Sequence, residues 1–173
     1  MAEMEIREGY HLERPNREKS SSKGMKAVII LLLLVSVGLM LIVTIGGWGT
    51  LAGAKVVQVF YMIVYLVMAF FIARWSRGVL PLAAALAIVL GIFAGIAGPE
   101  WFSRDKEGFT DPALDESILG LITLIIAPVQ ILLIGACLRG FQQEWNVEVE
   151  VPDGQSYHPG MFEDEPGGRP APA

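Results

Sequence analysis

The side chains that could do chemistry inside the long apolar runs of this chain are few and uncharged. Ser36, Tyr65 and Gln130 come near the middle of the runs, and Tyr61 and Thr123 come nearer one end. Tyr61 and Tyr65 are four residues apart and therefore share one face of a helix. Because an unpaired polar group in hydrocarbon is costly, we expect these side chains to turn inward and hydrogen-bond to one another.

Two interpretations of this polar seam stay open. It could bind a small ligand or hydrate a path for a solute. Pro128 supports that interpretation, because it removes the backbone hydrogen bond that the carbonyl of Leu124 would accept. The simpler interpretation is hydrogen bonding that holds helices together, worth about 0.6 kcal/mol per bond on average in membranes. We favour the simpler one.

The sequence contains no pattern typical of catalysis, metal binding or cofactor binding. Cys137 is the single cysteine, and His11 and His158 both lie outside the apolar runs, which argues against a haem or metal site among them. Motifs for phosphate binding, zinc proteolysis, serine hydrolysis and nucleic-acid binding are missing. We expect no enzyme, no cofactor and no nucleic-acid partner.

Carboxylates gather in the segment 100–116. Such oxygens suit a hard cation, but their spacing does not match a calcium-binding EF-hand loop. We therefore expect a solvated acidic loop in which Asp115 or Glu116 caps a helix, and binding of a cation or a partner stays an alternative. The acids are Glu100, Asp105, Glu107, Asp111, Asp115 and Glu116.

The elements that position these groups are four runs without Asp, Glu, Lys, Arg or His, at 27–45, 56–73, 79–97 and 117–138. A helix needs roughly 20 residues to cross the hydrocarbon of a bilayer. Apolar residues make up 53% of the chain and charged residues 18%, against roughly 25% charged in an average soluble domain. We predict an all-α integral membrane protein, a four-transmembrane-helix bundle over 26–139. The polar tails 1–25 and 140–173 are expected to be largely disordered.

Positive charge predicts the orientation. Nine Lys and Arg residues flank one side of the spans and three flank the other, which places both termini in the cytoplasm. The first set is Arg7, Arg14, Arg17, Lys19, Lys23, Lys26, Arg74, Arg77 and Arg139, and the second is Lys55, Arg104 and Lys106. Short links and the single cysteine favour a bacterial inner membrane. The alternative that the first span is a signal peptide cleaved after Ala54 is weaker, because 26 residues precede an unusually long apolar run.

Small residues recur every four positions in the third span, at Ala83, Ala87, Gly91 and Gly95. Such a stripe lets helix backbones approach closely in a membrane. We expect it to pack against a neighbouring span of the same chain, with a homo-oligomer interface as the alternative. Pro99 is expected to end this helix.

Residues 145–151 alternate apolar and polar side chains, which predicts a β-strand. A lone strand is unstable in water, so we expect it to pair with a second copy or a partner, or else the tail is disordered. The strand, the stripe and the uncharged spans favour a non-catalytic accessory or scaffold protein that binds membrane partners. An oligomeric pore or transporter for a neutral or lipophilic solute is the alternative.

Overall fold

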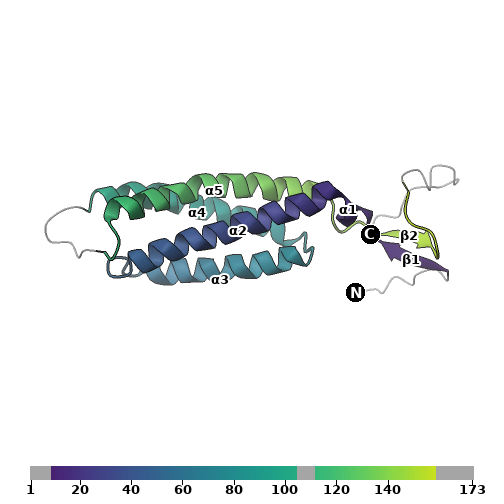
Figure 1. Cartoon of the computed structure of the whole chain (residues 1–173), viewed down its shortest axis with the longest axis horizontal. Coiled ribbons are helices and arrows are strands. Elements are labelled where there is room, and N and C mark those ends of the chain that lie inside the picture. Colours follow the sequence, from purple (N-terminus) through teal and green to yellow (C-terminus); the bar gives the residue numbers. More distant parts are fainter. Residues whose placement is uncertain (1–8, 105–111, 159–173) are drawn as a thin grey trace.

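Four long helices lie side by side in the computed structural model of the chain (Figure 1), which describes residues 9–104 and 112–158. Each is long and apolar enough to cross a membrane. They are α2 (Ser20–Gly46), α3 (Ala54–Ala73), α4 (Val79–Phe102) and α5 (Glu116–Gln142). A short helix α1 (Pro15–Glu18) precedes them, and two strands, β1 (Tyr10–Glu13) and β2 (Val149–Pro152), lie beyond one end of the bundle. We call this the sheet end, and the opposite end the loop end.

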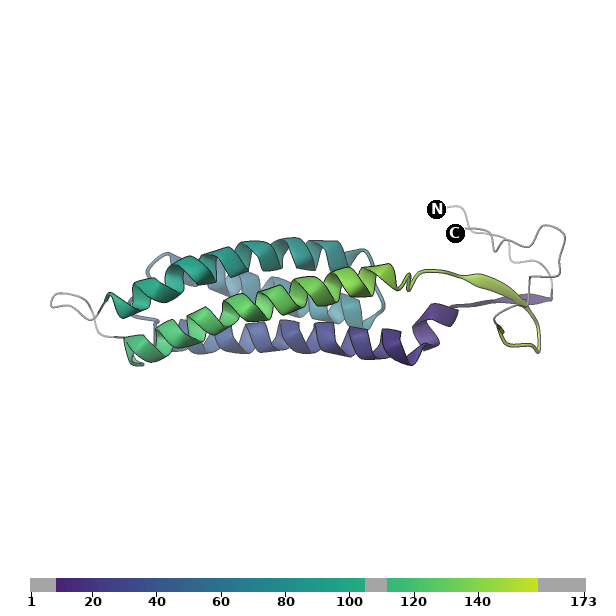
Figure 2. The ribbon, with the colours of Figure 1, turned by 90° about the horizontal axis from the view of Figure 1, so that it is seen from above.

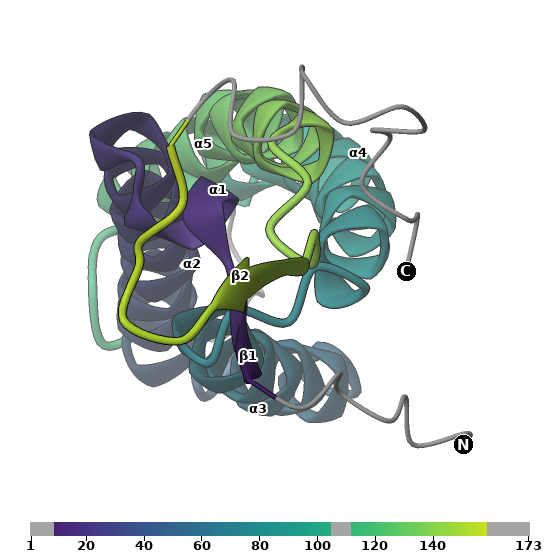
Figure 3. The same ribbon diagram turned by 90° about the vertical axis from the view of Figure 1, so that its right-hand side faces the viewer.

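Viewed from the sheet end, the helices surround one axis in the order α2, α5, α4, α3 (Figure 3). The contact between α4 and α5 is the most extensive, and that between α3 and α4 is much the smallest of the neighbouring pairs. Buried side chains such as Leu33, Ala87 and Leu133 fill the axis. Large apolar side chains such as Phe60 and Ile131 are exposed on the outer surface. A bundle that is apolar outside as well as inside is suited to a lipid surrounding.

The helices extend past the apolar runs into polar sequence. The helix α2 begins at Ser20 rather than Ala27, and long side chains such as those of Lys23 and Lys26 can reach out of the apolar zone at this end. The expectation that Pro99 ends α4 is wrong, since this helix continues to Phe102. Its last turn is held by Trp101, which is buried against Val43 and Leu119.

The two tails meet in a small antiparallel sheet (Figure 2). Tyr10 pairs with Pro152 and Glu13 with Val149. The expected strand at 145–151 is therefore found at 149–152, and its partner is the amino-terminal segment of the same chain, not a second copy. The expectation of disorder is wrong for most of 10–25 and 140–152, which contain β1, α1, the start of α2, the end of α5 and β2. Residues 1–8 and 159–173 lie outside the described part.

Candidate functional site

Gln130 of α5 joins three helices through its side chain. Its Oε1 accepts a hydrogen bond of 2.9 Å from the hydroxyl of Tyr65 on α3, and its Nε2 donates one of 2.9 Å to the Oγ of Ser36 on α2. The Ser36 hydroxyl in turn donates to the backbone carbonyl of Leu32. All three side chains are fully buried, at 0% exposure. The hydrogen bonding expected among Ser36, Tyr65 and Gln130 is present.

This triad is satisfied by its own members. Tyr65 donates to the Gln130 side chain and not to the Leu124 carbonyl that Pro128 leaves without a helical partner. A buried amide with both of its polar atoms bonded is stable in an apolar interior and has little need of water. The triad therefore fits the structural interpretation of the seam, in which polar side chains hold the helices in register.

Thr44 of α2 and Gln58 of α3 make a second interhelical contact, nearer the loop end. The Thr44 Oγ1 lies 2.5 Å from the Gln58 Oε1 and 2.7 Å from the carbonyl oxygen of Met40. Its hydroxyl can donate to either acceptor. This contact holds the Gln58 amide with its oxygen turned towards α2.

Thr123 and Tyr61 do not join the hydrogen bonds of the seam, so that part of the expectation is wrong. The Thr123 hydroxyl donates to the carbonyl of Leu119 in its own helix, at 2.7 Å, which satisfies it without a partner from another span. The Tyr61 ring packs edge to face against the Tyr65 ring, with 5.9 Å between centroids. Both residues instead line a pocket.

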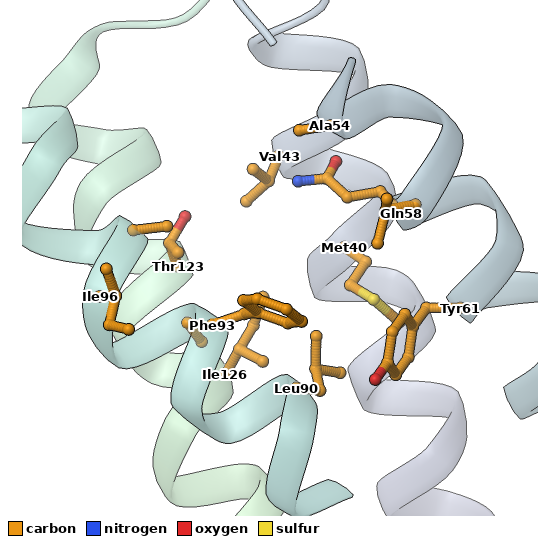
Figure 4. A pocket seen from close by; sticks show the side chains of 13 residues that line it. Met40, Val43, Ala54, Gln58, Tyr61, Leu90, Phe93, Ile96, Thr123 and Ile126 are labelled. Atoms are coloured by element: carbon orange, nitrogen blue, oxygen red, sulfur yellow. The ribbon is translucent and has the colours of Figure 1, made fainter. Parts of the chain in front are cut away.

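The pocket has a volume of about 320 Å³ and lies towards the loop end of the bundle (Figure 4). It is partly open, and its walls come from all four long helices. The lining residues are Met40, Val43, Ala54, Val57, Gln58, Tyr61, Leu90, Phe93, Ala94, Ile96, Ala97, Thr123 and Ile126. Apolar members such as Leu90 and Ile126 could not be recognised as pocket residues beforehand, because their sequence pattern is that of any core-facing or lipid-facing side chain.

The small-residue stripe of α4 faces α5 over part of its length. Ala83 and Ala87 are fully buried, and a Cβ built on Gly91 would lie 3.4 Å from the Cβ of Gln130. The expected continuation at Gly95 is wrong, since this glycine is exposed and a Cβ there would meet nothing within 4 Å. The close contact resumes at Gly98, because a helix with 3.6 residues per turn rotates away from a strict four-residue repeat. A homo-oligomer interface stays a prediction.

The acidic segment 100–116 is only partly described, and residues 105–111 lie outside the described part. Asp115 caps α5, as expected: its side chain accepts a 2.8 Å hydrogen bond from the backbone N–H of Ser117. Hydrogen bonds from the Ser117 side chain and backbone lower the pKa of Asp115. Among the described residues, no group of three or more His, Cys, Asp or Glu side chains could hold a metal ion.

The sheet is fixed to the bundle by contacts between α1 and the segment that follows α5. Arg14 pairs with Glu148, and the Arg17 Nε donates a 2.8 Å hydrogen bond to the carbonyl of Trp145. The Trp145 side chain is fully buried and packs edge to face on Trp75, with 5.3 Å between ring centroids. Burial of this large ring fills the sheet end of the bundle and anchors the segment that leads into β2.

Comparison with known proteins adds no assignment. No family model, curated protein or solved structure matches the chain. Similarity therefore indicates neither a family nor an activity, and the physical properties of the bundle, the pocket and the sheet are what bear on function.

Proposed function

We propose that the protein is a multi-pass membrane protein that acts as a non-catalytic accessory or scaffold subunit for membrane partners. Four helices of sufficient length and apolarity support the membrane location. Lys and Arg are concentrated at the sheet end, which supports an orientation with both termini in the cytoplasm, and the bacterial inner membrane is the membrane we propose.

The observation that carries the accessory role is the joining of both tails into one sheet at the sheet end. The strands β1 and β2 project from the bundle (Figure 2), and their base is held by Arg14, Arg17 and the buried Trp145. A two-stranded sheet alone is only marginally stable in water. A partner strand added to its edge would extend the backbone hydrogen bonding, as in recognition by β-augmentation.

The apolar runs of the four helices contain no Asp, Glu, Lys, Arg or His, which supports a role without ion coupling or proton relay. The same runs contain tyrosines and one cysteine, but no carboxylate or imidazole that could act as a base. Nucleophilic catalysis needs a nucleophile with an adjacent base. We therefore propose that the protein is not an enzyme.

Purification in mild detergent tests the accessory role. We expect a stoichiometric membrane partner with the wild-type chain and a reduced yield of that partner with Glu148→Arg, which breaks the pair with Arg14. The double variant Arg14→Glu/Glu148→Arg is the matched control and should restore the yield, because it rebuilds the pair with reversed charges. A wild-type chain that purifies only as a solitary monomer would contradict the proposal.

A second candidate function is passage of a neutral or lipophilic solute through an assembly of several copies. The partly open pocket favours it, whereas the bonded triad of Ser36, Tyr65 and Gln130 does not. Native mass measurement and a flux assay in liposomes distinguish the two functions.

A further inference from the structure

The pocket keeps two hydrogen-bond donors without a partner among the described residues. Tyr61 is only 7% exposed as a residue, and its hydroxyl bonds to no described group. Among the described residues no fully buried side-chain nitrogen or oxygen lacks a partner, so both donors are reachable from outside the protein. The Gln58 oxygen is held by Thr44, and its amide nitrogen donates to no described group. Figure 4 shows this nitrogen pointing away from α3 and across the pocket. Donors left unpaired in an apolar cavity are costly unless something accepts from them.

The opening of the pocket is apolar. The most exposed of its large lining side chains are Val57 on α3 with Phe93 and Ile96 on α4, at 49%, 54% and 64% exposure. These helices contact each other least of the neighbouring pairs. In a bundle surrounded by lipid, an opening between two spans with such a lining faces hydrocarbon, not water. A ligand would therefore enter sideways from the bilayer.

The lining also limits the charge of a ligand. Its thirteen residues include no Asp, Glu, Lys, Arg or His. A charged group brought into this pocket would lose its hydration without gaining a counter-charge, which is strongly unfavourable. The Thr123 hydroxyl uses its proton on the Leu119 carbonyl, so the donor that faces a ligand comes from the α3 side.

We propose that this pocket binds one uncharged molecule dissolved in the bilayer, whose apolar body carries a hydrogen-bond acceptor such as a carbonyl. The Gln58 amide donates to the acceptor, and side chains such as Tyr61, Leu90 and Ile126 contact the apolar body. The volume lies at the lower end of the range typical of small-molecule sites, roughly 300–1,000 Å³. This goes beyond the accessory role and requires only that the four helices lie in a membrane.

Photolabelling in vesicles of phosphatidylcholine and phosphatidylglycerol tests the site. Two probes that differ only in polarity are used: a decanone and a decane, each carrying a diazirine. We expect the decanone probe to label residues that line the pocket, and unlabelled decanone, but not decane, to compete. Competition in the wild-type chain keeps the test independent of whether any variant folds.

Gln58→Leu should lower labelling of the pocket by the decanone probe about fivefold, the loss expected for one hydrogen bond. Gln142→Leu, the same change at an exposed position near the end of α5, is the matched control and should leave labelling unchanged. Thermal unfolding of each variant shows whether the bundle stays folded. Equal labelling by both probes, or label spread over the outer faces of all four helices, would overturn the proposal and indicate ordinary lipid contact only.

Discussion

The hydroxyl of Tyr65 and the side-chain oxygen of Gln130 lie 2.9 Å apart inside the bundle, although 65 residues separate them in the chain. The other end of the same amide bonds to Ser36. One side chain thus ties α5 to both α2 and α3. Since all three groups are neutral and fully buried, the contact stabilises helix association without bringing charge into the bilayer.

Gln130→Leu should destabilise the folded bundle by roughly 1–2 kcal/mol, because it removes two interhelical hydrogen bonds and leaves the Tyr65 hydroxyl without an acceptor. Reversible unfolding in mixed detergent micelles measures the change. Thr123→Val is the control and should cost much less, since that hydroxyl bonds only within its own helix. Adding Tyr65→Phe to Gln130→Leu should cost less than the sum of the two single changes. Strict additivity would mean that the two side chains do not interact.

Gly98→Ala should destabilise the bundle by about 1–3 kcal/mol, the usual cost of overpacking. The added Cβ would lie 2.5 Å from the Cδ2 and 2.6 Å from the Cγ of Leu124. Gly95→Ala is the matched change one turn away, where a Cβ meets nothing within 4 Å, and it should be neutral or slightly stabilising because alanine favours a helix. The free energy of unfolding of both variants, measured under the same conditions, tests this difference. A larger loss at Gly95 would show that a partner helix covers the exposed part of the stripe.

The amino-acid sequence predicts the four helices well, but it predicts the sheet and the pocket poorly. An absence of charge over about 20 residues is a strong local signal, so each helix contains its apolar run, and the largest difference is at the start of α2. The depth of Ser36, Tyr65 and Gln130 follows from their positions along the spans. Because the three depths are similar, hydrogen bonding among these side chains could be predicted. The Thr123 hydroxyl could not be assigned in the same way, because a threonine can always bond to a carbonyl of its own helix.

Non-local pairing explains the remaining errors. The alternation at 145–151 predicts a strand, but nothing in Tyr10–Glu13 identifies that segment as its partner, because the pairing depends on where α2 and α5 end in space. Burial of Trp145 follows from the same juxtaposition of chain ends. The pocket is the gap left where α3 and α4 contact each other least, and it depends on the packing of the whole bundle.

The sheet should lose order in acid. The Glu13 carboxylate accepts a 3.0 Å hydrogen bond from the backbone N–H of Tyr157, and this bond and that with His11 lower the pKa of Glu13 from 4.5. A lowered pKa in the folded state means that the stabilisation is complete above pH 4.5 and is lost as the pH falls through the lowered value. The protection factor of the Tyr157 amide, which is its hydrogen-exchange rate relative to the intrinsic rate at each pH, measures this loss. Glu13→Gln should remove the pH dependence of the protection factor, and a protection factor that is equally pH-dependent in both chains would contradict the assignment.

Two serine positions test the orientation. In a Cys137→Ala background, Ser156→Cys lies beyond the sheet and Ser103→Cys lies at the loop end, both exposed. With the positive flanks in the cytoplasm, a maleimide that cannot cross membranes should label only the Ser103→Cys chain in intact cells. It should label the Ser156→Cys chain after permeabilisation. The reverse pattern would place both termini outside.

The most direct test of the account is washing of native membranes with alkaline carbonate, which releases proteins that are not inserted in the bilayer. If lipid surrounds the four helices, the intact chain stays with the membranes through this wash and comes into solution only with detergent. Release of the intact chain by carbonate alone would contradict the membrane location, and with it the functions proposed for the pocket and the sheet.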